Sequence, residues 1–506
     1  MKRRKWLQRL MTAFVLSLLF VSLVGATLQP NPQPQGTILQ TTINDWQQGT
    51  GATVDRRNLD ALHTPLLLGD HPGGSVRLAS QPSSWERQST SEPALPRGGP
   101  GAWDEQNVAE AAVLHDGTQF MMWYSGQEST TNHWQIGLAT STNGLDWNKY
   151  VANPVLTVGA PGSWDDSEVS FSSIMYDGEN YRSWYSGYSD AQQERNIGYA
   201  FSTNGINWTK HPTPVLSAGA EGEWDGQLVG NPTVLYDGAH YHLWYAGWLA
   251  PEGHWRIGHA TSTNGLDWTK DAANPVLVPG SEGDWDDYHV TAPSVLYDGE
   301  IFHLWYAGWD GPDYSGDSYG RIGYALSPNG TDWTKSVQNP VLDPTGGTWD
   351  PQWAVDPEVI FDGDLYHLWY SGGITWTGVQ IGYATAVPEY NNEGTYVSPL
   401  IDTACAEEEI PLWSTLIVHQ QPHTETMVYA LLDESGEPIE GFDTLWSGEE
   451  AGFFDLSDLS WRHERIYLRA TFYTAFPWRS PVLEDWEIRW VCQPQPYHAF
   501  LALVRK

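Results

Sequence analysis

The sequence predicts an all-β protein in which a five-bladed β-propeller is joined to a β-sandwich. Three sequence pairs recur in step, and together they define five repeats of 60 to 64 residues. Trp-Asp begins at residues 103, 164, 224, 285 and 349, Trp-Tyr at 123, 184, 244, 305 and 369, and Ile-Gly at 136, 197, 257, 322 and 381. Self-similarity at a fixed period is typical of a repeat architecture, and no helical period competes with it.

Each repeat is predicted to contain four short strands. In the third repeat the run VGNPTVLY passes through Asp237-Gly238 into YHLWYAGW, and RIGHATS then passes through Asn264-Gly265 into a last strand. Asp-Gly and Asn-Gly are the strongest short signals for a two-residue hairpin turn. Small four-stranded sheets at a regular spacing protect their edges by radial repetition, which is the principle of a propeller.

An N-terminal strand is predicted to close the last blade. The fifth repeat ends after Ile381-Gly382 without an Asn-Gly turn or a fourth strand. Trp85 and the segment 92–95 precede the first repeat at the spacing of the missing strand. We therefore expect five whole blades between residues 83 and 393.

The flanking regions have their own predicted structure. Alternating runs such as STLIVH and RIYLRATFY predict a β-sandwich over residues 394–492. Residues 27–82 are expected to be a Pro-rich spacer followed by strands that could join this sandwich, and residues 493–506 form a tail without a predicted role. A disulfide is expected between Cys405 and Cys492, with two free thiols as the alternative.

The first residues have the layout of a secretory signal. A basic start at residues 2–5 is followed by an apolar run and by the small residues Val24-Gly25-Ala26. We expect residues 1–26 to be a cleaved signal peptide and the protein to be secreted, the alternative being an uncleaved anchor. No later stretch is long and apolar enough to predict a membrane span.

The charge restricts the partners. The chain has 25 Lys and Arg against 62 Asp and Glu, a formal net charge of −37. Nucleic-acid binding needs clustered basic residues, so the charge excludes nucleic acid as an expected partner, argues against anionic membranes and favours a neutral substrate. The oligomeric state is not predicted.

One position breaks the repeat where a propeller places its active site. Seven residues after each Trp-Asp tryptophan, at the entry to the innermost strand, stand Glu110, Phe171, Asn231, Ala292 and Asp356. Glu110 and Asp356 fall in adjacent blades, because the fifth blade neighbours the first. Glu168 and His289 lie nearby on the predicted rim, so both join Asn231 among the candidate site residues.

Tryptophans that fall outside the repeat are candidates for stacking on sugar rings. The six in the propeller region map to the same face: Trp134, Trp248, Trp255, Trp309, Trp353 and Trp376. The alternative is that they pack long loops over the ring.

Paired carboxylates in a confined, aromatic space are what glycoside hydrolysis requires, one protonated and the other ionised. Alternatively, these carboxylates cap backbone amides or pair with Arg182, Arg195, Arg256 or Arg321. The last three lie within two residues of an Ile-Gly pair and are expected to be structural.

No cofactor is expected, although a structural calcium ion stays open. Asp165-Asp166 and Asp286-Asp287 supply oxygen donors without a recognisable calcium loop.

The segment VDPEVIFDGDLYHLWYSG, with Asp356-Pro357, resembles the five-bladed glycoside hydrolases of the arabinanase, β-xylosidase, levansucrase and invertase superfamily, especially families 43 and 32. The resemblance covers the propeller and implies that Asp356 is the base or nucleophile. In ring order it implies that Glu110 tunes the pKa and that Glu168 is the general acid. The chain departs from the family pattern, because Asp-Pro lies in the last repeat and Ser170 stands where the acid is expected.

The sequence thus favours a secreted glycoside hydrolase that acts on a neutral glycan of the arabinoside, xyloside or fructoside class, with Asp356, Glu110 and Glu168 as catalytic residues. Two alternatives stay open: a non-catalytic carbohydrate-binding propeller and a cell-surface interaction scaffold.

Overall fold

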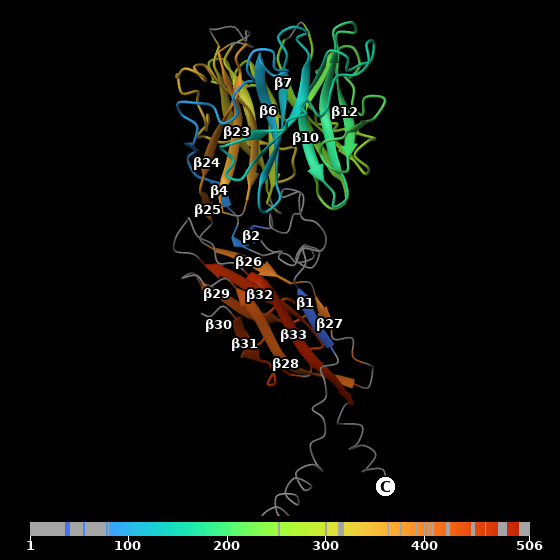
Figure 1. Ribbon diagram of the computed structural model, residues 1–506. Coiled ribbons are helices and arrows are strands. Elements are labelled where there is room, and N and C mark those ends of the chain that lie inside the picture. The colour runs from blue at the N-terminus through green and yellow to red at the C-terminus, as the bar shows by residue number, and fades with distance from the viewer. Residues whose placement is uncertain are drawn as a thin grey trace, which may run out of the picture.

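The computed structural model is built from β-strands, with no helix among the residues it describes (Figure 1). It describes residues 36–40, 54–55, 77–78 and 80–494, the last range with gaps at 251–252, 299–300, 312–317, 363, 375–376, 391–392, 399, 403–404, 406–408, 421–425, 447–450, 461 and 474–482. The predicted signal peptide and the predicted tail beyond residue 494 lie outside the described residues. Within the described part of the chain no helix is long and apolar enough to cross a membrane.

The repeat region forms five units of antiparallel strands, which we number 1 to 5 in chain order. Unit 1 comprises β6 (Asn107–His115), β7 (Phe120–Gln127), β8 (Trp134–Ser141) and β9 (Asn148–Lys149). Unit 2 comprises β10 (Glu168–Tyr176), β11 (Tyr181–Ser189), β12 (Glu194–Ser202) and β13 (Thr209–Lys210). Unit 3 comprises β14 (Leu228–Tyr236), β15 (Tyr241–Trp248), β16 (Arg256–Ser262) and β17 (Thr269–Lys270).

Unit 4 comprises β18 (His289–Tyr297), β19 (Phe302–Trp309), β20 (Gly320–Ser327) and β21 (Thr334–Lys335). Unit 5 comprises β22 (Trp353–Phe361), β23 (Tyr366–Gly373) and β24 (Gln380–Ala386). Its fourth strand is β5 (Glu86–Arg87), which pairs with β24 through Ala384 and Arg87. Leu95 also bridges Ile381, as Leu156 bridges Ile136 in unit 1. The N-terminal segment therefore completes unit 5, as the sequence predicts.

The first strands of the units contact one another in a closed cycle, from β6 through β10, β14, β18 and β22 back to β6. Residues of all five strands line a narrow channel of about 80 Å³. This cyclic order is the arrangement expected of a propeller.

The recurring sequence pairs form one packing element. In unit 1 the Trp103 ring lies flat against Gly126 of the Trp-Tyr strand and Gly137 of the Ile-Gly strand. A Cβ atom at either glycine would approach the ring to 2.4 Å or 2.6 Å, so no other residue fits there. The spacing of the three pairs is therefore fixed by side-chain packing inside each unit.

The C-terminal region contains two sheets that share one apolar core. One sheet has the order β1 (Gly36–Gln40), β33 (Leu483–Pro494), β28 (Glu409–Gln420) and β31 (Ala451–Asp455). The other has the order β26 (Glu393–Val397), β32 (Arg465–Tyr473), β29 (Thr426–Leu432) and β30 (Leu445–Trp446), with β27 (Ile401–Asp402) beside β32. β1 reaches this region from the N-terminal side of the repeats and pairs with β33.

Four further short strands pair near the junction of the two regions: β2 (Val54–Asp55) with β3 (Arg77–Leu78), and β4 (Ser80–Pro82) with β25 (Pro388–Tyr390). The predicted disulfide is present, since Cys405 and Cys492 are bonded with their Cα atoms 5.6 Å apart.

Candidate active site

A pocket of about 710 Å³ opens where the first strands of the units begin. Eight of the residues predicted for the site line it: Glu110, Glu168, Asp356, Asn231, Trp134, Trp248, Trp255 and Trp309. They come from all units and are brought together only by the closed cycle of strands. Its volume lies within the range of ordinary small-molecule sites.

The non-repeated position has an unusual backbone conformation in every unit. Glu110, Phe171, Asn231, Ala292 and Asp356 all have positive φ angles, between 44° and 57°. Each lies at a β-bulge, where the pairing of the first and second strands shifts register. Such a conformation is costly for a residue other than glycine, and bulges re-aim side chains next to active sites. The strain is thus repeated around the ring, while the chemistry of the side chain is not.

Serine hydroxyls support three of these bulges. The N–H of Glu110 donates to Ser371 Oγ at 3.0 Å, and the N–H of Asn231 donates to Ser186 Oγ at 2.9 Å. The N–H of Phe171 donates to Ser125 Oγ at 3.2 Å. The equivalent residues of the second strands in units 3 and 4 are alanines, Ala246 and Ala307.

Glu110 is buried in the pocket wall with 5% of its surface exposed. Its Oε2 accepts a hydrogen bond from the N–H of Phe171 at 3.1 Å, and Ser125 bonds to the same carboxyl group. Burial, followed by the negative charge of Asp356, raises the pKa of Glu110 well above its usual range. Both effects favour the protonated form of Glu110.

Asp356 is the second buried carboxyl group of the pocket. Burial raises its pKa to about 7, although a hydrogen bond from Ser371 opposes the shift. The same Ser371 hydroxyl accepts the backbone N–H of Glu110, so it contacts the carboxyl group of Asp356 and the main chain of Glu110. The Oδ2 atom of Asp356 is buried and has no hydrogen-bond partner among the described residues. Buried polar atoms are almost always bonded, so this oxygen is available to a bound molecule.

Glu168 lies on the same wall and is held differently. Its Oε2 forms an ion pair with Arg195 Nη2 at 2.7 Å, and its Oε1 accepts a hydrogen bond from Ser170. The expectation that Arg195 is purely structural is wrong, because Arg195 lines the pocket. Its neighbour Asn196, and not Arg195, directly precedes Ile197, so the side chain is free to turn toward Glu168.

The tryptophans predicted for the face divide into two groups. Trp134, Trp248 and Trp255 are partly exposed in the pocket, and the rings of Trp248 and Trp255 lie 6.4 Å apart. Trp309 lines the pocket with only 2% of its surface exposed.

Two predicted residues do not reach the pocket, and one cannot be placed. Trp353 is 1% exposed and packs edge-on against Trp309, with ring centroids 5.2 Å apart, so it supports the wall from behind. His289 is also buried; its Nδ1 accepts the N–H of Trp255, and burial and the neighbouring His254 lower its pKa to about 3. Trp376 lies outside the described residues.

The sequence analysis missed several polar residues of the pocket. Four glutamines, two threonines and a tyrosine line it: Gln106, Gln127, Gln193, Gln227, Thr291, Thr377 and Tyr188. Gln127, Tyr188 and Thr291 lie in strands and the other four in loops, so only their grouping by the fold reveals them.

Glu358, in the axial channel, was also missed. Burial raises its pKa to about 8, while its Oε1 accepts the N–H of Val113 at 3.0 Å. It stands nine residues after the Trp-Asp tryptophan, where the other units have small residues such as Ser173 and Ser294. A carboxyl group at a position otherwise occupied by small side chains was the available signal.

The acidic pairs considered for calcium have other partners. Asp165 and Asp286 each lie 2.6 Å from a lysine Nζ, of Lys210 and Lys335 respectively. Asp166 and Asp287 accept turn N–H groups at 2.7 Å. No cluster of three or more metal-binding side chains occurs among the residues that the structure describes.

Comparison with known proteins gives partial similarities. No protein-family model matches the chain. An uncharacterised protein of Mycobacterium tuberculosis is 28% identical over 245 residues, which cover 47% of this chain and 76% of that protein. A 1,2-beta-oligomannan phosphorylase of a Thermoanaerobacter species is 30% identical over 100 residues, 19% of this chain and 33% of that enzyme.

A solved structure described under the GH130 family of mannoside phosphorylases and glycoside hydrolases shares 17% identity and a TM-score of 0.48, covering 60% of this chain and 94% of that one. The structural neighbours are glycoside hydrolases and mannoside phosphorylases.

Proposed function

We propose that the five units are the blades of a five-bladed β-propeller, spanning residues 83–393, and that its pocket is the active site of a glycoside hydrolase. The two C-terminal sheets would then form a β-sandwich over residues 394–492, which β1 joins. The observation that carries the proposal is that two buried carboxyl groups, Glu110 and Asp356, line one pocket, with one oxygen of Asp356 lacking a hydrogen-bond partner among the described residues.

The two carboxyl groups suit opposite roles. Burial and the charge of Asp356 favour the protonated form of Glu110, which suits it to donate a proton to the leaving oxygen. Asp356 ionises first and has an unpartnered oxygen, so it is the base or nucleophile. Glu168 is bound by a guanidinium and is better suited to accept hydrogen bonds from sugar hydroxyls than to give up a proton.

The lining supports a neutral substrate. Arg195 is the one cation among the described residues of the pocket, and Glu168 already pairs with it. The rest of the polar lining consists mainly of neutral amides and hydroxyls, beside tryptophan rings on which sugars can stack. This composition supports hydrolysis over phosphorolysis, since a phosphate dianion would need an unpaired cation.

The substrate class is proposed as an arabinoside, xyloside or fructoside, and β-mannosides join the test because one relative is named as an oligomannan phosphorylase. We also propose that the protein is secreted after removal of residues 1–26, on the basis of their signal-like sequence.

The test is a screen of the purified protein on aryl arabinosides, xylosides, fructosides and mannosides, with and without phosphate. Asp356→Asn and Glu110→Gln are compared with Glu358→Gln, which removes a buried carboxyl group two residues from Asp356 but outside the pocket. Hydrolysis lost in the first two variants and kept in the third supports the proposal. Equal hydrolysis by wild type and Asp356→Asn overturns it, and glycan binding without turnover favours the carbohydrate-binding alternative.

A further inference from the structure

A second pocket, of about 580 Å³, lies beside the strand that closes unit 5. Its walls are the segment 81–85, the loop 336–341 of unit 4 and Glu389. We call it the closure gap. The closure gap lies where strands β4 and β25 pair. In Figure 1 this is the end of the repeat region nearest the C-terminal sheets.

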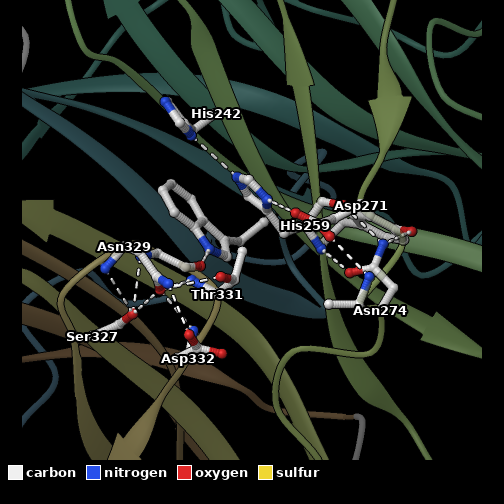
Figure 2. A network of polar contacts seen from close by, with 12 residues as sticks. His242, His259, Asp271, Asn274, Ser327, Asn329, Thr331 and Asp332 are labelled. Carbon is white, nitrogen blue, oxygen red and sulfur yellow. Dashed lines mark hydrogen bonds and ion pairs between the residues drawn. The ribbon is translucent and has the colours of Figure 1, made fainter.

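In the other four positions around the ring, a turn glycine of the next unit lies where the closure gap lies in unit 5. The indole N–H of the Trp-Tyr tryptophan donates to the carbonyl of the turn glycine in the next unit, at 2.7 to 2.9 Å: Trp123 to Gly205, Trp184 to Gly265, Trp244 to Gly330 and Trp369 to Gly144. These glycines lie against the indole rings and have positive φ. Figure 2 shows one such turn, in which Asn329 accepts the N–H groups of Thr331 and Asp332.

Unit 5 lacks this turn because its fourth strand comes from the N-terminus. Trp85 still packs edge-on against Trp305 with ring centroids 6.4 Å apart, as Trp268 packs against Trp184 at 6.3 Å. Pro82 now stands three residues before the closing tryptophan, where the other units have the turn glycine. The indole N–H of Trp305 is consequently buried with no hydrogen-bond partner among the described residues, and Trp305 is 0% exposed. An indole N–H can only donate, so the wall of the closure gap contains a buried donor that no described residue uses.

We propose that the closure gap is a second, non-catalytic binding site for a neutral sugar. Trp85 is only partly buried and offers an aromatic surface beside the donor of Trp305. Gln81, Ser84 and Gln338 are exposed and supply neutral hydrogen-bonding groups.

The described lining residues include one carboxylate, Glu389, and no cation, so an anionic ligand is disfavoured. A donor next to an aromatic surface and neutral amides matches the alternating apolar and hydroxyl surfaces of a sugar ring.

The site is separate from the candidate active site. The third strand of each unit begins at the pocket face and ends at the turn face, and β20 has eight residues. The two sites therefore lie about 25 Å apart, at roughly 3.3 Å per residue. A sugar bound at the closure gap would tether a longer glycan without touching Asp356.

The experiment titrates the full-length protein with mannobiose, xylobiose and arabinobiose by calorimetry, beside aryl-glycoside turnover. Gln338→Trp fills the gap from an exposed loop position. Ala273→Trp is the matched control, because Ala273 precedes Asn274-Pro275 in unit 3 as Gln338 precedes Asn339-Pro340 in unit 4, where the turn glycine Gly330 is in place. Trp255→Ala weakens the candidate active site.

We expect one binding event to persist in Trp255→Ala and to disappear in Gln338→Trp, with turnover kept in Gln338→Trp and Ala273→Trp. Binding that is unchanged in Gln338→Trp, or no binding of any disaccharide in Trp255→Ala, overturns the proposal. The outcome is independent of the proposed function, because the second binding event is measured whether or not any glycoside is hydrolysed.

Discussion

Two sets of buried carboxyl groups, one in the scaffold and one in the pocket, differ in their counter-charges. The five Trp-Asp aspartates are all at most 3% exposed. In units 1 to 4 each pairs with a lysine Nζ at 2.6 Å: Asp104 with Lys149, Asp165 with Lys210, Asp225 with Lys270 and Asp286 with Lys335. In unit 5 the N-terminal strand supplies Arg87 to Asp350 instead, at 4.0 Å. Each aspartate also accepts a hydrogen bond from the tyrosine of the Trp-Tyr pair.

Glu110 and Asp356 are also buried, but they have no cation within their described contacts. Burial without a counter-charge disfavours the ionised form, whereas burial with an ammonium group supports it. The scaffold aspartates thus form ion pairs that hold strands together, whereas burial raises the pKa of both pocket acids, that of Asp356 to about 7. Repetition distinguishes the two sets, because the lysines recur and the pocket acids do not.

The largest expected effect comes from removing the charge at the pocket pair. Asp356→Asn should lower kcat on the best aryl glycoside by about 10²- to 10⁴-fold, the usual contribution of a positioned acid or base. Its melting temperature should stay equal or rise, because no buried charge needs to be accommodated. Calorimetry and steady-state kinetics measure both. A variant with a lower melting temperature but an unchanged kcat would assign Asp356 to the scaffold.

The reverse pattern is expected for the scaffold. Lys210→Met leaves Asp165 buried without its cation, which should cost about 3 kcal/mol in the free energy of unfolding. Urea denaturation measures this loss, and kcat of the folded protein should change little. Val337→Met is the control for the added methionine, because Val337 is exposed and its replacement removes no lysine. A stable Lys210→Met variant with impaired turnover would contradict the distinction between the two sets.

This distinction was only partly available in the sequence. The repeats predicted the units, the closing strand and the non-repeated position that carries Glu110 and Asp356, because apolar and glycine spacing follows directly from packing. The role of Ser371 was hidden, since its hydroxyl reaches Glu110 across 261 positions of the chain. The ion pair between Arg195 and Glu168 depends on the rotamer of a long side chain, which a repeat pattern does not encode.

Burial of loop residues was the other source of error. Trp353 and His289 fall at the entry of first strands, where the sequence indicates an exposed rim. Trp353 packs edge-on against Trp309, and His289 accepts the backbone N–H of Trp255. Such contacts depend on how neighbouring units pack, which a position within the repeat does not predict.

The pH dependence of stability offers a third test. The pKa of Asp356 is about 7 in the folded protein and close to 3.8 in the unfolded chain. The folded state holds the proton more tightly, so its stabilising effect is complete below about pH 4 and is lost as the pH rises to about 7. We expect the free energy of unfolding to fall by about 3 to 4 kcal/mol across this window, less so in Asp356→Asn.

Asp362 provides the contrast for this measurement. Although burial opposes it, the hydrogen bond and charge of His367 lower the pKa of Asp362 to about 2. Its stabilising effect is therefore present above about pH 3.8 and is lost as the pH falls toward 2. Equal pH profiles for wild type and Asp356→Asn between pH 4 and 7 would refute the pKa shift at Asp356.

The smallest expected effect concerns the Ser371 hydroxyl, which bonds to the carboxyl group of Asp356 and to the backbone N–H of Glu110. Ser371→Ala removes a hydrogen bond that stabilises the ionised form of Asp356, so the pKa of Asp356 should rise further. The acidic limb of the pH–rate profile should move to higher pH, and kcat should fall by about threefold to tenfold, the value of roughly one hydrogen bond.

Alanine occurs naturally at this place in units 3 and 4, as Ala246 and Ala307, so the fold should tolerate the change. Ser186→Ala is the matched control, since Ser186 holds the bulge at Asn231, where there is no carboxyl group to titrate. A shift of the acidic limb in Ser371→Ala but not in Ser186→Ala would show that Ser371 acts on the ionisation of Asp356. Equal pH–rate profiles in both variants would show that Ser371, like Ser186, only supports the strained backbone of a bulge.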